Sequence, residues 1–259
     1  MNKTVIEAKG ISKYFAGIPA LQNVSIQVKT GEVLCLLGDN GAGKSTLIKI
    51  LSGVFRQSSG ELLIDGEVAH LQNPGDARSR GIATVHQYGG TVPLISVARN
   101  FFLGAEPTLG RWPFRRLDTE LANRVALEEL QKLGIRRVMD AGQLVGTLSG
   151  GERQALAIAR AVYFGARVLI LDEPTSALGV KEASTVLRLI KQVSERGTSV
   201  ILITHNAHHA LTVGDSFAVL IQGEIAATFS RGEKSKLEVL NLMAGGEEIE
   251  ALQAELEAS

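Results

Sequence analysis

The sequence predicts an α/β fold in which a parallel β-sheet forms the core, an N-terminal antiparallel β subdomain precedes it and a helical insertion interrupts it. Two observations carry this prediction. Short apolar runs at 33–37, 82–85, 168–171 and 200–203 are each followed by polar or turn-forming residues, which is typical of strands buried on both faces of a parallel sheet. Amphipathic helical patterns separate these runs, and alternating strands and helices favour a parallel sheet.

The N-terminal region departs from this alternation. The segments 5–8, 21–28 and 61–68 are predicted to be antiparallel strands, and Asp65-Gly66 is a favourable pair for a tight hairpin turn. We therefore expect a small antiparallel β subdomain in front of the parallel core.

The helices are predicted from apolar stripes and from their start and stop signals. Segments 46–52 and 186–193 each carry such a stripe. Asp118 or Thr119 can cap a further helix that ends at Gly134.

The predicted organisation is a single domain, residues 1–246. Its core is expected to consist of 1–88 and 155–246, and a helical subdomain of 89–154 lies between these two parts. The acidic tail, 247–259, has apolar residues at helical spacing, and we interpret it as a short surface helix.

Composition limits the classes of function. The chain has 259 residues and equal numbers of basic and acidic side chains, 27 of each, so it lacks the basic excess typical of a nucleic-acid-binding protein. Its single cysteine, Cys35, excludes an internal disulfide and is interpreted as a small buried side chain. Neither a signal peptide nor a membrane-spanning run is apparent, so we expect a cytoplasmic chain that serves a membrane only through a partner.

The sharpest motif is a glycine-rich loop between a predicted strand and a predicted helix. It matches the pattern G-x-x-x-x-G-K-[ST] in full, and its residues are Gly38, Asp39, Asn40, Gly41, Ala42, Gly43, Lys44 and Ser45. Glycines let backbone N–H groups surround phosphate oxygens, and the helix that follows presents its positive end to the same anion. Lys44 can reach the β- and γ-phosphates, the Ser45 hydroxyl can bind Mg²⁺, and Thr46 completes the expected nucleotide-binding set. By itself the motif predicts only a nucleoside triphosphate as ligand, because kinases, GTPases and helicases share it.

Two carboxylates end the apolar run at 168–171. Asp172 is expected to hold Mg²⁺ through its water shell, and Glu173 to orient or deprotonate the attacking water. The alternative is an acidic pair that faces solvent at the end of a strand.

Gln87 and His205 each follow another predicted strand. The carboxyl ends of parallel strands meet at one edge of a sheet, so we expect both side chains to face one pocket with Ser45, Asp172 and Glu173. The remaining histidines lack this support and are interpreted as structural; they are His70, His86, His208 and His209.

A second glycine-containing helix start lies at Ser149-Gly150-Gly151, ahead of the predicted helix 155–164. Such a start can bind an anion. A chain with one phosphate loop has little use for a second site of its own. Two chains arranged head to tail explain it, because each would complete the triphosphate site of the other.

Together these motifs resemble the ATPase subunits of ABC transporters, and the resemblance extends from about Val5 to Gly246. It implies the ABC ATPase fold, which has a P-loop NTPase core of the RecA-like type, with ATP and Mg²⁺ as ligands. The matching motifs, in order, are Walker A (38–45), the Q-loop Gln87, the LSGGE-Q signature (148–154), Walker B (168–173) and the switch histidine His205.

The resemblance also implies roles for single residues. Tyr14 would stack on adenine, with the adjacent Phe15 as the alternative, and His205 would sense the γ-phosphate. Ser149, Gly150 and Gly151 would come from the opposite chain.

The sequences at 101–107, 161–166 and 174–182 are similar to those of the monosaccharide-importer branch. This resemblance implies a permease and, indirectly, an extracytoplasmic sugar-binding protein as partners. This chain has one copy of each motif and is therefore expected to form a homodimer on the inner face of the cell membrane. Gly179 departs from the family, in which aspartate is common, and this puts the usual D-loop contacts in doubt.

Other readings remain open at this point. One is an ABC ATPase of another importer or exporter with a different cargo. A non-transport ABC protein acting on DNA or ribosomes would usually show paired domains or basic segments, and a small-molecule phosphotransferase would not need the signature.

Overall fold

The computed structural model describes residues 3–87, 90–111, 113–135 and 137–244. Its central element is a six-stranded sheet with the strand order β12-β11-β3-β10-β9-β6. Neighbours from β11 to β6 are parallel and β12 is antiparallel to β11. The strands are β3 (Val33–Leu37), β6 (Ile82–Val85), β9 (Val168–Asp172), β10 (Ser199–Thr204), β11 (Ser216–Ile221) and β12 (Glu224–Ser230). The four predicted parallel strands are confirmed, whereas β11 and β12 were not predicted.

A second, antiparallel sheet has the strand order β2-β1-β4-β5. Its strands are β1 (Thr4–Phe15), β2 (Ile18–Lys29), β4 (Ser59–Ile64) and β5 (Glu67–Val68). Asp65 and Gly66 form the β4–β5 turn with positive φ of 56° and 87°, the backbone that a tight hairpin requires. The predicted β subdomain is therefore confirmed, and its first strand extends as far as Phe15.

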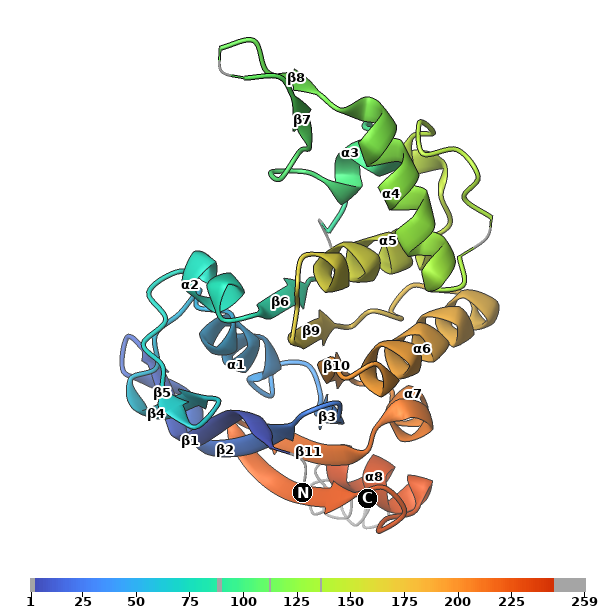
Figure 1. Ribbon diagram of the computed structural model, residues 1–259. Coiled ribbons are helices and arrows are strands. Elements are labelled where there is room, and N and C mark those ends of the chain that lie inside the picture. Colours follow the sequence, from blue (N-terminus) through green and yellow to red (C-terminus); the bar gives the residue numbers. More distant parts are fainter. Residues whose placement is uncertain (1–2, 88–89, 112, 136, 245–259) are drawn as a thin grey trace, which may run out of the picture.

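The helices are α1 (Lys44–Leu51), α2 (Pro74–Ser79), α3 (Val97–Phe101), α4 (Thr119–Lys132), α5 (Gly150–Tyr163), α6 (Val180–Glu195), α7 (Ala207–Val213), α8 (Lys236–Met243) and the 3₁₀ turn Val145–Thr147. Helix α1 lies between the two sheets, and α5, α6 and α7 pack on the other side of the six-stranded sheet (Figure 1). The Asp118 carboxylate caps α4 by accepting from the backbone N–H of Leu121 at 3.0 Å. The helix predicted at 155–164 begins earlier, at Gly150, because Ser149 caps it.

The helical insertion also contains a hairpin, which the sequence did not predict. Strands β7 (Thr108–Leu109) and β8 (Arg116–Leu117) pair in an antiparallel manner, and in Figure 1 they project away from α3 and α4. Strands of two residues are too short to show an alternating pattern. The predicted tail, 247–259, lies outside the described residues.

The core lies on both faces of the six-stranded sheet, which explains its continuous apolar strands. On one face Leu34, Leu36 and Ile203 pack with α1 and the antiparallel sheet. On the other face Cys35 and Leu37 pack with the helical layer. Cys35 is fully buried, as predicted, and burial raises the pKa of its thiol. Within the described part of the chain, no helix is both long enough and apolar enough to cross a bilayer.

Candidate functional site

The register of the parallel strands brings several predicted residues to one edge of the sheet. Leu37, the last residue of β3, pairs with Thr204 at the end of β10. Asp172, which ends β9, pairs with Ile203, and Val85 of β6 pairs with Leu171. The residues that follow these strand ends therefore share one edge; they are Gly38, Gln87, Glu173 and His205.

The loop 38–45 needs glycine at two positions for steric reasons. Gly38 has φ 149°, and a Cβ there would lie 2.2 Å from the Leu220 carbonyl oxygen. Gly43 has φ 103°, and its Cβ would lie 2.8 Å from the Ala20 carbonyl oxygen. Gly43 is also the N-cap of α1, so no side chain caps this helix. In addition, the first turn of α1 carries no acidic residue. The first N–H groups of α1 are thus available to an anion.

Lys44 is buried inside this loop. Its Nζ donates to the carbonyl oxygens of Gly38 and Asp39, at 2.8 Å each. Burial lowers the pKa of Lys44, and the nearby carboxylates of Glu173, Asp39 and Asp172 oppose that shift. The ammonium group is therefore held where its charge faces both the loop and the two strand-end carboxylates. Ser45 is exposed and Thr46 is half-buried beside it.

Glu173 is held in an unusual conformation at the end of β9. Its φ is 49°, a strained value for a residue other than glycine, and such strain is common in functional sites. Its Oε1 accepts from the backbone N–H of His205 at 2.8 Å, and the His205 Nδ1 lies 2.8 Å from the same oxygen. The Thr204 hydroxyl donates to Oε2 at 3.3 Å. The Glu173 side chain is 12% exposed and that of His205 is 56% exposed, so the histidine covers the carboxylate from the solvent side.

Asp172 lies one residue deeper in the sheet. Burial raises the pKa of its carboxyl group, while His86 and Lys44 act in the opposite direction. His86, which the sequence analysis interpreted as structural, is thus close enough to affect Asp172. Its position after β6, beside β9, is the signal that could have identified it.

Gln87 reaches the segment that follows Glu173. Its Nε2 donates to the Ser176 hydroxyl at 2.6 Å. In the same segment, the buried Thr175 hydroxyl lies 3.0 Å from the Nδ1 of His209. Sequence reasoning missed Thr175, Ser176, Thr204 and His209; of these, only Thr204, which precedes His205 at a strand end, carried a signal.

The signature residues form the start of α5. The Ser149 hydroxyl accepts from the backbone N–H of Glu152 at 3.3 Å, and the Glu152 carboxylate accepts from the N–H of Ser149 at 2.9 Å. A Cβ on Gly150 would lie 2.4 Å from the Leu178 side chain, and one on Gly151 would lie 3.2 Å from Glu182. This helix start therefore packs on the segment that leads into α6. No hydrogen bond among the described residues joins it to the loop 38–45.

Two adjacent aromatic residues near the end of β1 differ in their surroundings. The Phe15 ring packs edge-on against Phe55, with 5.4 Å between ring centroids, and Lys13 lies over it. The Tyr14 side chain has no ring contact among the described residues and is 46% exposed. Tyr14 is the one free to stack on a flat ligand.

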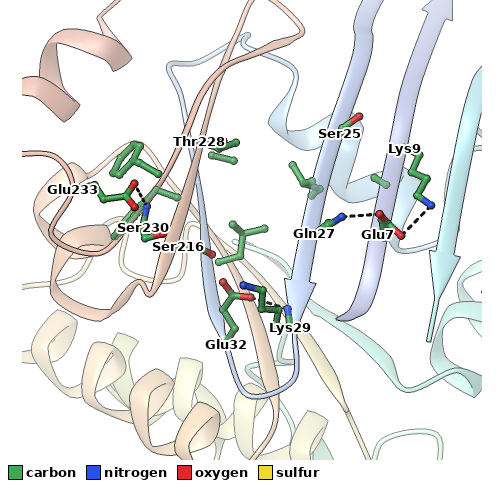
Figure 2. Close-up of a pocket in the computed structure, with 16 residues that line it drawn as sticks. Glu7, Lys9, Ser25, Gln27, Lys29, Glu32, Ser216, Thr228, Ser230 and Glu233 are labelled. Carbon is green, nitrogen blue, oxygen red and sulfur yellow. Dashed lines mark hydrogen bonds and ion pairs between the residues drawn. The ribbon is translucent and has the colours of Figure 1, made fainter. Parts of the chain in front are cut away.

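A cavity of about 630 Å³ lies away from this edge, between β1–β2 and β11–β12 (Figure 2). Part of its polar lining is paired internally: Gln27 donates to Glu7 at 2.6 Å, and Ser230 donates through its N–H to Glu233 at 2.8 Å. None of the predicted site residues lines it. We therefore locate the candidate site from the strand ends and not from cavity size.

Comparison with known proteins follows this geometry. The family model described as "ABC transporter" matches residues 21–176. The fructose import ATP-binding protein of Rhizobium meliloti is 38% identical, covering 94% of this chain and 95% of that protein. The xylose/arabinose import ATP-binding protein of Sulfolobus acidocaldarius is 39% identical over 92% and 93% of the two chains. A ribose import ATP-binding protein of Bacillus cereus is 39% identical, but this chain spans 48% of its length.

Solved structures give the same fold. A nucleotide-free ATP-binding cassette from an ABC transporter superposes with a TM-score of 0.79 at 23% identity, covering 92% of this chain and 94% of that one. A dimeric bacterial ABC transporter cassette gives a TM-score of 0.73 at 27% identity, covering 88% of this chain and all of that one. The same cassette was also solved as a dimer in a post-hydrolysis state with ADP and Pi, with a TM-score of 0.72 at 27% identity over the same coverage.

Proposed function

Since this chain belongs to the ABC transporter family, as an ATP-binding and ATP-hydrolysing subunit, we propose that it powers the import of a simple sugar through a separate membrane permease. The observation that carries the proposal is the match over more than nine-tenths of both chains to two relatives named for sugar import. Those relatives are named for different sugars, so the proposal extends to the class of cargo and not to one sugar.

We assign residues 1–246 to one ATP-binding domain, with a core of 1–88 and 155–246 and a helical subdomain of 89–154. In this scheme Tyr14 stacks on adenine and the N–H groups of the loop surround the phosphates. The nucleotide-binding residues are Tyr14, Gly38, Asp39, Asn40, Gly41, Ala42, Gly43, Lys44, Ser45 and Thr46. The positive φ at Gly38 and Gly43 and the absence of a side-chain cap on α1 support this role.

Lys44 offsets the charge of the bound phosphates. Its ammonium group already donates to two loop carbonyls, so little reorganisation is needed for it to meet an anion there. Because its pKa is lowered by burial, a polyanion in the loop would favour its protonated form and thereby strengthen its own binding.

The residues at the sheet edge also fit Mg²⁺. This cation prefers oxygen ligands, and Ser45, Gln87 and Asp172 offer a hydroxyl, an amide and a carboxylate. The raised pKa of Asp172 reflects a half-buried carboxylate whose negative charge a cation would stabilise. When bound, Mg²⁺ would neutralise phosphate charge, and the amide oxygen of Gln87 would be its ligand while the Nε2 of Gln87 donates to the Ser176 hydroxyl.

Glu173 then orients the attacking water and accepts its proton. The hydrogen bonds from Thr204 and from the backbone of His205 hold its carboxylate in one orientation, which is what a positioned base requires. His205 is more exposed and forms the outer side of the pair, so its ring can turn toward a γ-phosphate.

We propose that the active form is a head-to-tail homodimer in which Ser149, Gly150 and Gly151 contact the nucleotide held by the other chain. The dimeric cassette relative supports this arrangement. The dimer would lie against the inner face of the cell membrane, beneath permease subunits and without nucleic acid. An extracytoplasmic sugar-binding protein would deliver the cargo to the permease.

Mixing two inactive variants tests the dimer. Lys44→Ala removes the phosphate contact in one chain, and Ser149→Glu places a negative charge at the start of α5 in the other. Mixed dimers would contain one intact site, because one chain keeps its loop and the other keeps its signature. ATP hydrolysis well above that of either variant alone is expected; a mixture no more active than its components would exclude shared sites.

Co-purification with the permease tests the cargo. The complete transporter in liposomes should hydrolyse ATP faster when fructose, xylose or ribose is supplied with the sugar-binding protein, whereas an amino acid should have no effect. Stimulation by a non-sugar solute alone would reassign the cargo, and stimulation by DNA or ribosomes without a permease would support a non-transport protein.

A further inference from the structure

The β7–β8 hairpin is an exposed structured feature outside the nucleotide site. Thr108 pairs with Leu117 and Leu109 with Arg116, and the Asp118 N–H donates to the Pro107 carbonyl at 2.8 Å, which closes the base of the hairpin. Near its tip, the Phe114 N–H donates to the Arg111 carbonyl at 2.9 Å. The hairpin is therefore a defined element, and in Figure 1 it projects away from the helices that carry it.

The charge of this hairpin is concentrated and unpaired. Arg111, Arg115 and Arg116 are all exposed, and none forms an ion pair within the described residues. Residues 107–117 contain no acidic side chain, although the whole chain has a formal net charge of zero. The local excess of positive charge is thus a property of this element and not of the protein's composition.

Apolar side chains are exposed on the same element. The Phe114 side chain is 86% exposed and that of Leu109 is 44% exposed. Because Phe114 is largely exposed, it does not contribute the free energy of folding that a buried phenylalanine would contribute. A partner that offers both negative charge and an apolar layer would bury Phe114 and neutralise the arginines together.

We propose that the β7–β8 hairpin contacts the membrane surface, with its arginines on the phosphates of anionic phospholipids and Phe114 in the interfacial layer. The inference rests on the proposed function, which brings the chain to a bilayer. All three cations are arginine, whose planar group binds phosphate through two hydrogen bonds. Aromatic residues favour the membrane–water interface, and basic residues favour anionic leaflets.

The combination favours a lipid surface over an acidic segment of a protein. A protein partner would need a groove that fits one projecting phenylalanine, whereas a fluid bilayer accepts a convex apolar tip without a matching shape. The lipid therefore accounts for Phe114 and for the arginines at once.

The experiment is sedimentation of the full chain, without permease, with vesicles of phosphatidylcholine alone or mixed with phosphatidylglycerol. Binding to the anionic vesicles is expected at low ionic strength, with loss at high salt. The triple variant Arg111→Gln, Arg115→Gln, Arg116→Gln should bind on the order of 100-fold more weakly, since each basic residue near an anionic surface contributes about fivefold. Phe114→Ser should weaken binding on its own.

A matched control changes the same number of charges elsewhere. Arg188→Gln, Lys191→Gln and Lys236→Gln alter exposed cations on α6 and α8, and this variant should bind the vesicles like the wild type. Equal loss in both triple variants, or no binding of the wild type to anionic vesicles, would overturn the proposal. So would binding that requires the permease and ignores lipid charge, which would indicate an acidic protein partner.

ATP hydrolysis by the free chain should be the same for all these variants, because the hairpin contributes nothing to the strand-end site. Absence of wild-type binding to anionic vesicles, with intact sugar-stimulated hydrolysis in the complete transporter, would thus contradict the hairpin proposal alone. Intact vesicle binding without sugar stimulation would contradict only the proposed cargo.

Discussion

The starts of α1 and α5 look alike in sequence, since both combine glycines with a serine, but they differ in structure. At α1 the N-cap is Gly43 in a left-handed conformation, and no side chain caps the helix. At α5 the N-cap is Ser149, and its hydroxyl and the Glu152 carboxylate satisfy two N–H groups. The first helix start has free donors and a buried lysine, whereas the second is already capped within its own chain. In the proposed dimer, the start of α1 would therefore hold the phosphates of its own chain, whereas the capped start of α5 would add contacts to a nucleotide that the other chain already holds.

This difference leads us to expect that the two motifs depend differently on a partner chain. The loop 38–45 faces Glu173 and Asp172 across one edge of its own sheet, as the influence of both carboxylates on Lys44 indicates. The start of α5 packs instead on Leu178 and Glu182, away from any phosphate site of the described chain. Variants at the two helix starts therefore distinguish ATP binding by a single chain from ATP hydrolysis by the proposed dimer.

The largest expected effect is on ATP turnover, when Glu173, which faces the loop 38–45, is changed. Glu173→Gln keeps the side-chain shape but removes the base, so turnover should fall by on the order of 10²- to 10⁴-fold. ATP binding and ATP-dependent dimers should persist, because the loop and the signature are unchanged. Phosphate release and size-exclusion chromatography with ATP measure the two properties; hydrolysis at the wild-type rate would refute the role of Glu173.

Gly43→Ala tests the open helix start. The new Cβ would lie 2.8 Å from the Ala20 carbonyl oxygen on a backbone with φ 103°, so the loop must distort and ATP affinity should fall at least about tenfold, or about 1.4 kcal/mol. Gly134→Ala is the control, since Gly134 has φ 82° with no atom near its Cβ position. It should cost about 1–2 kcal/mol of stability and leave ATP affinity, measured by calorimetry, unchanged.

Ser149→Ala tests the capped helix start. Loss of the cap should lower the free energy of unfolding by about 1 kcal/mol, and hydrolysis should fall while ATP binding by the single chain is unchanged. Ser235→Ala is a matched control because Ser235 and Glu238 form the same kind of capping box on α8. It should lower thermal stability to a similar degree and leave hydrolysis intact. Equal activity of the two variants would mean that Ser149 serves only as a helix cap.

The smallest effect is expected at Gly179, the N-cap of α6, which packs beside α5. Its φ is −65°, and an added Cβ would approach only the Glu182 carboxylate, at 4.0 Å, so aspartate fits without strain. Gly179→Asp should raise the free energy of unfolding by a few tenths of a kcal/mol and leave hydrolysis unchanged, with Gly179→Asn as the uncharged control. A marked loss of activity in both variants would show that the glycine itself is needed there.

The sequence was sufficient for elements whose signals are local. Continuous apolar runs located the four parallel strands, because each buries side chains on both faces of the sheet. Asp65-Gly66 located a hairpin, because few residue pairs accept two positive φ values. In contrast, the sequence did not predict β7 and β8, because a strand of two residues is too short to show an alternating pattern and is defined only by its pairing partner. Strands β11 and β12 were also not predicted.

For the candidate site, the sequence by itself determined which residue types were available and in what order. The tertiary structure alone decided the contact that His205 makes with Glu173, that His86 lies close to Asp172, and that Gln87 donates to Ser176. It also decided that the two glycine-rich helix starts are not equivalent. The physical reason is that a motif depends only on residues that are close together along the chain. Strand register and close packing, by contrast, set distances between residues that are far apart in sequence.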